Sequence, residues 1–355
     1  MNKFFSGVSI RYSKGVVPAN YSDFDDEISN YGPDIRSSLR LKKIFQYNTH
    51  HICPSSVTGL DLAISAFSSL FSSSDLGPSD IDAVIYVTQT PEYPVPASSC
   101  ILHGVLSLRE DCYVQDINDG CAGFIKAFSC ALSLVATFNL DNVAIVCADS
   151  LSHRISPHDR NSYPLVGDAA TVVIVSPSIA DTTPSFIDIR HHGSKWNSLR
   201  IPHGGARNPI TSQSFQYFED SFGNKRKPSD LEMNGEEVFL FTQTTVPSFI
   251  DDFLSSNQLD VHSFGRIYFH QPNLFILKKL ISRYKLDPKK VPSFVAENLG
   301  NSSSCTIPLL LAGDKLDEAE KESVLMCGFG IGLTWGLIHT NLENHNPLGI
   351  SYYDT

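Results

Sequence analysis

A cysteine in the first half of the chain has surroundings suited to a nucleophile. Cys121 lies in the segment NDGCAGF (118–124), between an expected strand and an expected helix. The amino end of a helix carries unbonded N–H groups and a partial positive charge, which favour the thiolate that acts as the nucleophile. The small neighbouring residues leave room for a substrate carbonyl. The structural alternative is a cysteine buried in a tight turn.

Two further polar residues follow segments expected to be strands. His270 comes directly after RIYF (266–269), and Asn301 lies in a polar turn after an expected strand at 293–297. Ligands and chemistry gather at the carboxyl ends of strands in α/β sheets, so a Cys, a His and an Asn converging there would form an acyl-transfer site. The structural alternatives are a buried histidine and a helix N-cap.

A glycine-rich segment, GFGIGLTWG (328–336), follows the next expected strand. Alternating glycines let the backbone approach a ligand closely. The spacing does not match the GxGxxG fingerprint of a dinucleotide site, and no βαβ unit follows it. The segment fits an oxyanion-hole loop, in which backbone N–H groups face a thioester oxygen.

Composition limits the class of protein. The chain has 355 residues, of which 42% are hydrophobic and 18% are charged, which is typical of a globular protein. Its formal net charge of −11 disfavours nucleic-acid binding. We expect no membrane span and no signal peptide, and therefore a cytoplasmic protein. Eight cysteines include no CxxC pair, so no metal site is expected.

Strand and helix patterns alternate along the chain, which argues for α/β layers. Residues 1–50 look irregular, and residues 177–230 should be mainly loop because they are rich in Pro, Gly, Ser and Asn. Helices are expected at 55–74, 122–138, near 235–257, up to about 284 and after Asn301. Strands are expected at 80–88, 112–117, 142–148, 170–176, 266–270, 293–297 and 323–327.

The two halves of this pattern have nearly equal spacing. Thr88 and Cys121 are 33 residues apart, and His270 and Asn301 are 31 apart. The interval to the next strand end is 26 residues in both halves. A duplicated α/β unit explains this simply. We expect the halves to comprise residues 1–177, with the cysteine, and 178–355, with the histidine and the asparagine.

Four motifs together resemble one enzyme family. DGCAGF, HQPN, GNSS and GFGIGLTWG, in this order, are similar to motifs of the β-ketoacyl-acyl-carrier-protein synthase III family, and the resemblance spans about residues 80–340. It implies the thiolase fold, in which two pseudo-symmetric βαβ-type halves form an αβαβα layered sandwich, and a homodimer. The loop PEYPVP (91–96) would reach the partner subunit.

The resemblance also implies roles for individual residues. Cys121 would take the acyl group from a thioester, and His270 and Asn301 would assist decarboxylation of a malonyl extender. The backbone N–H groups of Cys121 and Ile331 would form the oxyanion hole. The product would be a β-ketoacyl thioester, made without a cofactor in fatty-acid or specialised lipid or polyketide biosynthesis.

Departures from the family pattern bear on the acyl donor. Residues 40–52 lack the tryptophan that clamps coenzyme A in well-known members, and His153 stands at the position of the clamping arginine. We therefore expect an acyl carrier protein as donor, with coenzyme A thioesters as the alternative. Phe275 replaces a basic docking residue. On the same expected helix, three cations could dock the carrier or simply form a solvated face: Lys278, Lys279 and Arg283.

Other functions stay open at the level of sequence. An acyltransferase of the same fold would pass the acyl group from Cys121 to an oxygen or nitrogen, with His270 as general base. Retention of Asn301 favours carbon–carbon condensation instead. A thiol protease does not fit the context of the cysteine. A non-catalytic partner subunit would usually have lost the cysteine or the histidine.

Overall fold

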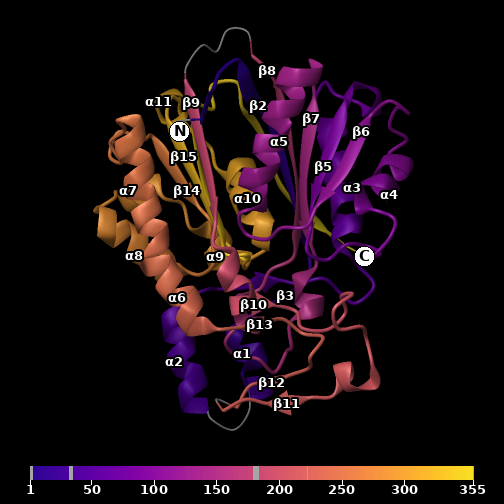
Figure 1. Cartoon of the computed structure of the whole chain (residues 1–355), viewed down its shortest axis with the longest axis vertical. Coiled ribbons are helices and arrows are strands. Elements are labelled where there is room, and N and C mark those ends of the chain that lie inside the picture. Colours follow the sequence, from indigo (N-terminus) through magenta and orange to yellow (C-terminus); the bar gives the residue numbers. More distant parts are fainter. Residues whose placement is uncertain (1–2, 32–34, 179–183, 222, 355) are drawn as a thin grey trace.

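Two β-sheets stand side by side in the computed structural model, with helices between them and on both outer faces (Figure 1). The structure describes residues 3–31, 35–178, 184–221 and 223–354. Short elements gather below the sheets in this view. Within the described part of the chain, no helix is both long and apolar enough to cross a membrane.

The first sheet has six strands in the order β17-β2-β8-β7-β5-β6. Their bounds are Asn346–Tyr353 (β17), Val8–Pro18 (β2), Ala169–Pro177 (β8), Val143–Asp149 (β7), Ala83–Val87 (β5) and Tyr113–Ile117 (β6). β5 runs parallel to β6 and β7, so the carboxyl ends of these three strands share one edge. The strands predicted between residues 80 and 176 are confirmed.

The second sheet has five strands in the order β1-β9-β16-β15-β14. Their bounds are Lys3–Phe5 (β1), Ser185–His191 (β9), Thr334–Thr340 (β16), Val324–Gly330 (β15) and Arg266–Phe269 (β14). β14 runs parallel to β15, and the remaining pairs are antiparallel. The order β14-β15-β16-β9 repeats the directions of β5-β7-β8-β2, which confirms the duplication.

Each end of the chain contributes a strand to the sheet built mainly from the other half of the sequence. β1 pairs with β9 in the second sheet, and β17 pairs with β2 in the first. The predicted boundary after residue 177 coincides with the last residue of β8. The division into halves stays a prediction.

Eleven helices are present in the described ranges. They are α1 (Phe24–Glu27), α2 (Ile35–Phe45), α3 (Gly59–Ser73), α4 (Ser98–Val105), α5 (Gly123–Phe138), α6 (Gly235–Gln243), α7 (Thr245–Asn257), α8 (Leu274–Tyr284), α9 (Phe294–Asn298), α10 (Thr306–Gly313) and α11 (Glu318–Lys321). Short strands complete the lower part of the molecule: β3 (Tyr21–Ser22), β4 (His50–His51), β10 (Leu199–Arg200), β11 (Phe218–Glu219), β12 (Lys225–Arg226) and β13 (Glu232–Met233).

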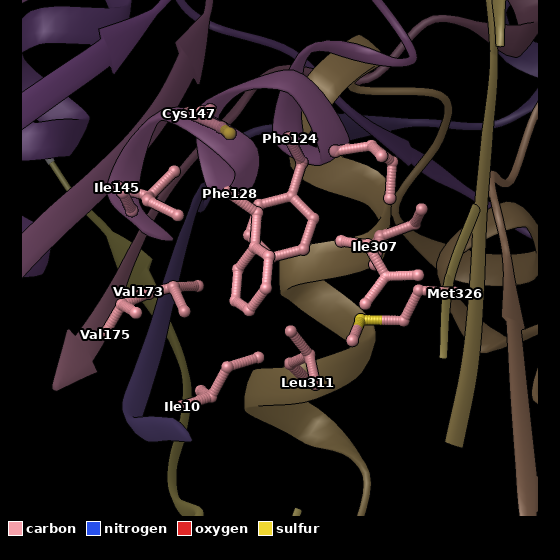
Figure 2. Packing of buried hydrophobic residues seen from close by; sticks show 14 of the residues in the cluster. Ile10, Phe124, Phe128, Ile145, Cys147, Val173, Val175, Ile307, Leu311 and Met326 are labelled. Atoms are coloured by element: carbon pink, nitrogen blue, oxygen red, sulfur yellow. The ribbon is translucent and has the colours of Figure 1, made fainter. Parts of the chain in front are cut away.

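Three apolar clusters hold the layers together. α5 and α10 lie between the sheets, and residues of both sheets join them in one central cluster (Figures 1 and 2). Because side chains alternate along a strand, Val143 and Ile145 of β7 face this cluster, whereas Ala144 and Val146 join the cluster beneath α3. A third cluster joins α7 and α8 to the second sheet. The expected αβαβα sandwich is confirmed.

The prediction of a strand at 293–297 is wrong, because this segment contains helix α9. The buried side chain of Gln271 explains the difference. Its Nε2 donates hydrogen bonds to the carbonyl oxygens of Phe269 (3.0 Å) and Pro292 (3.2 Å). The amide therefore occupies the edge of β14, where a counterpart of β6 would pair.

The expectation that residues 1–50 are irregular is also wrong. They contain β2, an inner strand of the first sheet, although its sequence includes a lysine and two serines. Lys14 is accommodated because its ammonium donates to the carbonyl oxygen of Leu348 in β17 (3.2 Å). The described part of 177–230 is mainly loop, as predicted, although it contains β9, which pairs on both sides. The helix expected near 235–257 is two helices, α6 and α7, that meet at Thr244.

The central layer predicts a large difference between two phenylalanines of α5. The ring of Phe128 is 1% exposed in the central cluster (Figure 2), whereas Phe138 is 67% exposed. Phe128→Ala should lower the free energy of unfolding by about 3–5 kcal/mol because it leaves a cavity. Phe138→Ala, the matched control, should change it by less than about 0.5 kcal/mol. Chemical denaturation measures both, and equal losses would contradict this assignment of layers.

Candidate active site

Cys121 lies at the amino end of α5, directly beyond the carboxyl edge of the first sheet. The helix starts tightly against β5, since a Cβ on Gly123 would lie 2.5 Å from Cγ1 of Val87. Gly123 N–H donates to the carbonyl oxygen of Gly120 (2.6 Å), which closes the turn that carries the cysteine. Only 9% of the Cys121 surface is exposed. The predicted position between a strand and a helix is confirmed.

The resting cysteine is a thiol. The pKa of Cys121 is raised to about 12, mainly by burial and also by the nearby carboxylate of Asp119. Hydrogen bonds from the Ser303 side chain and from the backbone N–H groups of Cys121 and Ile331 act in the opposite direction. Desolvation therefore outweighs the hydrogen bonds that favour the thiolate. The thiol must lose its proton during the reaction.

The glycine-rich segment at the end of β15 lies directly against the nucleophile. A Cβ on Gly330 would lie 2.6 Å from Cβ and 2.7 Å from Sγ of Cys121, so a larger residue cannot occupy this position without displacing the cysteine. A Cβ on Gly328 would lie 3.1 Å from the Cys121 carbonyl oxygen. This close approach brings the Ile331 N–H to the sulfur. Both backbone donors predicted for an oxyanion hole thus lie beside Cys121.

His270 follows β14 and is fixed by the neighbouring strand. Its N–H donates to the carbonyl oxygen of Cys327 in β15 (2.8 Å). The imidazole is 1% exposed and meets the ring of Phe329 edge-on, with 5.4 Å between centroids. Burial lowers its pKa to about 3. The side chain is therefore neutral at physiological pH.

A hydroxyl determines which nitrogen of His270 carries the proton. Nδ1 lies 2.7 Å from Oγ1 of Thr306. The Thr306 hydroxyl has one proton and donates it to the carbonyl oxygen of Ser303 (3.2 Å). In this arrangement the hydroxyl accepts from Nδ1–H, and Nε2 carries the lone pair. In the other neutral tautomer the ring proton is on Nε2, and the hydroxyl donates to Nδ1.

Asn301 lies in a turn clamped between two segments. Its N–H donates to the carbonyl oxygen of Leu165 (2.6 Å), and its own carbonyl oxygen accepts from Gly167 (3.0 Å). The preceding Gly300 has φ +85°, and a Cβ there would lie 2.5 Å from the Val166 carbonyl oxygen, so this position requires glycine. The alternative role of Asn301 as a helix N-cap is excluded, because Ser302 precedes the short 3-10 helix at Ser303–Cys305 and Cys305 precedes α10.

The side chain of Asn301 has a defined orientation. Its Oδ1 accepts a hydrogen bond from the Ser303 N–H (3.0 Å). The carboxamide therefore presents Nδ2–H as the donor for a substrate oxygen. Ser303 thus contacts Asn301 directly and His270 through Thr306, a role that the sequence reasoning missed because nothing in a run of three serines distinguishes one of them.

The three cations proposed for docking lie on α8, which begins four residues after His270. Lys278 donates to Oε1 of Gln46, at the end of α2, and Arg283 pairs with Asp251 at 3.3 Å. The Lys279 ammonium lies over the ring of Phe275, 5.4 Å from its centroid. His153 is bound instead to the carbonyl oxygen of Cys53 (3.2 Å). Among the residues with described coordinates, no cluster of metal ligands is found.

Comparisons with known proteins agree with this architecture. The family model for 3-oxoacyl-[acyl-carrier-protein (ACP)] synthase III matches residues 115–193. A second model, for the C-terminal part of this synthase, matches residues 254–341. A β-ketoacyl-[acyl-carrier-protein] synthase III from Rhodopirellula baltica is 30% identical over 93% of this chain and 97% of the relative. One from Clostridium perfringens is 30% identical over 78% of this chain and 82% of the relative.

Solved structures extend the likeness to three dimensions. A 3-oxoacyl-(acyl-carrier protein) synthase from Burkholderia xenovorans LB400 superposes with a TM-score of 0.88 at 28% identity, covering 99% of both chains. The thiolase fold expected from the sequence is confirmed.

Burial of His270 predicts a pH dependence of stability. Above about pH 6.5 the histidine is neutral in both states. As the pH falls, the unfolded chain takes up a proton that the folded chain refuses until its pKa of about 3, so stability is lost across this window. Between about pH 7 and about pH 5 the loss from this group is about 2 kcal/mol.

A variant isolates this contribution. His270→Asn should remove about 2 kcal/mol from the difference in unfolding free energy measured at these two pH values. The exposed His192 provides the control variant His192→Asn. Denaturant titration at each pH makes the comparison, and an unchanged pH dependence in His270→Asn would contradict a neutral, buried imidazole.

Proposed function

Because the chain belongs to the β-ketoacyl-[acyl-carrier-protein] synthase III family, whose members are condensing enzymes, we propose that Cys121 takes an acyl group from a thioester and transfers it to the carbon of a malonyl thioester with release of carbon dioxide. The observation that carries this proposal is the oriented amide of Asn301, which hydrogen bonds connect to the buried His270 through Ser303 and Thr306. A simple acyl transfer to oxygen or nitrogen needs a base and an oxyanion hole, and gives such an amide no task.

The first step is acylation of the cysteine. The sulfur of Cys121 attacks the thioester carbonyl, the bond to the donor sulfur breaks, and the proton of the thiol leaves with the donor thiol. The N–H groups of Cys121 and Ile331 stabilise the negative oxygen of the tetrahedral intermediate. Lone-pair density on Nε2 of His270 gives the thiol proton an acceptor on this route.

The second step is decarboxylation. The bond to the malonyl carboxylate breaks, and its electron pair moves toward the thioester oxygen to give an enolate. Nδ2–H of Asn301 would donate a hydrogen bond to that oxygen, as would Nε2–H of His270 in the neutral tautomer whose Nδ1 accepts from the Thr306 hydroxyl. The enolate carbon then attacks the acyl carbonyl on Cys121. The carbon–sulfur bond breaks, the thiolate takes a proton from solvent, and a β-ketoacyl thioester leaves.

Intact-protein mass spectrometry tests both steps. Wild-type protein should gain the acyl mass from an acyl-carrier-protein or acyl-coenzyme A donor and lose it, with release of carbon dioxide, when malonyl-carrier protein is added. Cys121→Ala should gain no acyl mass, because the nucleophile is absent. The matched control Cys100→Ala, at an exposed cysteine, should label normally.

A second variant separates the two steps. His270→Ala should still acquire the acyl group, but carbon dioxide release should fall by about 100-fold or more because the enolate loses a donor. Normal labelling of Cys121→Ala would refute the assignment of the nucleophile. An acyl group on wild type that malonyl thioester cannot remove would favour transfer to an alcohol or an amine.

We further propose an acyl carrier protein as the partner, bound to a basic surface formed by α2 and α8. The two helices contain no acidic residue and carry seven cations: Arg36, Arg40, Lys42, Lys43, Lys278, Lys279 and Arg283. The bond from Lys278 to Gln46 joins them. α8 begins four residues after His270, so an acidic carrier on this surface would sit beside the site. α2 extends the surface beyond the residues that the sequence suggested.

Charge reversal tests this surface. Lys43→Glu and Lys279→Glu, both at exposed positions, should each raise KM for malonyl-carrier protein by about tenfold while leaving KM for malonyl-coenzyme A unchanged. The control is Lys315→Glu, at an exposed position between α10 and α11. Equal effects on both substrates would contradict carrier docking here.

The remaining expectations concern assembly and surroundings. We propose a homodimer, supported by large apolar side chains exposed in and near the 91–96 loop: Tyr93, Val95, Val105 and Tyr113 are 56%, 82%, 54% and 46% exposed. Coenzyme A thioesters remain candidate donors. The proposed chemistry needs no cofactor beyond its thioester substrates, and a cytoplasmic location remains a prediction.

A further inference from the structure

Ser303 connects two residues of the proposed catalytic set, Asn301 and His270. The backbone of this residue binds Asn301 through N–H and Thr306 through C=O, and Thr306 in turn binds His270. Ser303 is 1% exposed. Its φ of +55° lies in the left-handed region, which a serine adopts only when its surroundings hold it there. The backbone bonds supply that constraint and fix the direction of the side chain.

Gln89 holds the hydroxyl from the other side. The hydroxyl of Ser303 donates to Oε1 of Gln89 (3.0 Å). Gln89 follows β5, and its N–H donates to the buried carboxylate of Asp149 (2.7 Å). Its carboxamide lies against the turn of the nucleophile, because a Cβ on Gly120 would lie only 2.8 Å from Oε1. Glycine before Cys121 therefore makes room for this glutamine.

The proton count at Ser303 differs between the two states of the cysteine. A hydroxyl has one proton, and in the resting site this proton is on the bond to Gln89. Its oxygen can then only accept a hydrogen bond, whereas lowering the pKa of Cys121, as the Ser303 side chain does, requires the hydroxyl to donate to the sulfur. A thiolate cannot donate and is stabilised by donors. Loss of the thiol proton therefore favours rotation of the hydroxyl from Gln89 to the sulfur.

We propose that Ser303 is a further catalytic residue for acylation, whose hydroxyl turns from Gln89 to the sulfur of Cys121 as the thiol proton departs, and that Gln89 restrains this turn. The S–H bond breaks, its electron pair stays on sulfur, and its proton goes to the departing donor thiol. The link to acylation rests on the proposed function, whereas the effect of Ser303 on the reactivity of the Cys121 thiol is independent of it.

Alkylation of Cys121 by iodoacetamide, followed over a range of pH by peptide mass spectrometry, tests the thiol directly. Ser303→Ala should slow alkylation at mildly alkaline pH by about tenfold, because the thiolate loses a donor. Gln89→Met retains the length of the side chain but removes the amide acceptor. It should accelerate alkylation by about three- to tenfold, because the hydroxyl is then available to the sulfur. Opposite directions for the two variants distinguish this switch from general damage to the site.

Two more variants separate the hydroxyl from the backbone. Ser303→Gly removes the hydroxyl and relaxes the positive φ, so it should slow alkylation as the alanine variant does. Ser302→Ala removes a neighbouring buried hydroxyl and should leave the rate unchanged. Wild-type rates in Ser303→Gly, or slowing by both Ser303→Ala and Gln89→Met, would overturn the proposal.

Single-turnover acylation from an acyl thioester gives the second measurement. The variants should rank as they do in alkylation, with Gln89→Met fastest and the Ser303 variants slowest. Acylation rates that these substitutions leave unchanged would overturn the role of Ser303 in the reaction. If the variants rank as expected in alkylation but wild-type protein accepts no acyl group, the proposed function is refuted instead.

Discussion

Desolvation at the junction of the two sheets governs the chemistry of this site. The amino end of the central helix α5 and the turn before α10 are both buried between the two sheets. The main apolar cluster lies in the same layer. Burial keeps Cys121 as a thiol and His270 as a neutral imidazole. Charge therefore appears only during the reaction, at atoms already surrounded by hydrogen-bond donors. Donors fixed in a dry site stabilise such charge without having to reorganise.

The turn between Asn301 and Thr306 connects the donors to one another. Its backbone orients the Asn301 amide, its threonine sets the tautomer of His270, and its Ser303 hydroxyl reaches Cys121. Segment 165–167 clamps the start of this turn through backbone hydrogen bonds. Since the clamp comes from the first half of the chain and the turn from the second, the site exists only when both halves are assembled.

The basic surface formed by α2 and α8 has a charge opposite in sign to the net charge of the protein. The chain has a net charge of −11, yet two touching helices beside the site carry cations and no carboxylate. Such local segregation favours an acidic partner at one face and disfavours it elsewhere. The aromatic ring beneath Lys279 positions that ammonium without neutralising it.

The sequence by itself determined the layers and the family, because strands with alternating or continuous apolar residues and glycine-rich turns are local signals. The Cys–His–Asn set that it predicts stays a prediction. It could not reveal β2, whose Lys14 is satisfied by a strand from the other end of the chain. It also misassigned 293–297, where the Gln271 side chain occupies the strand edge. The protonation states and the place of Ser303 were decided by tertiary structure alone, because burial and hydrogen-bond partners arise only when distant segments meet.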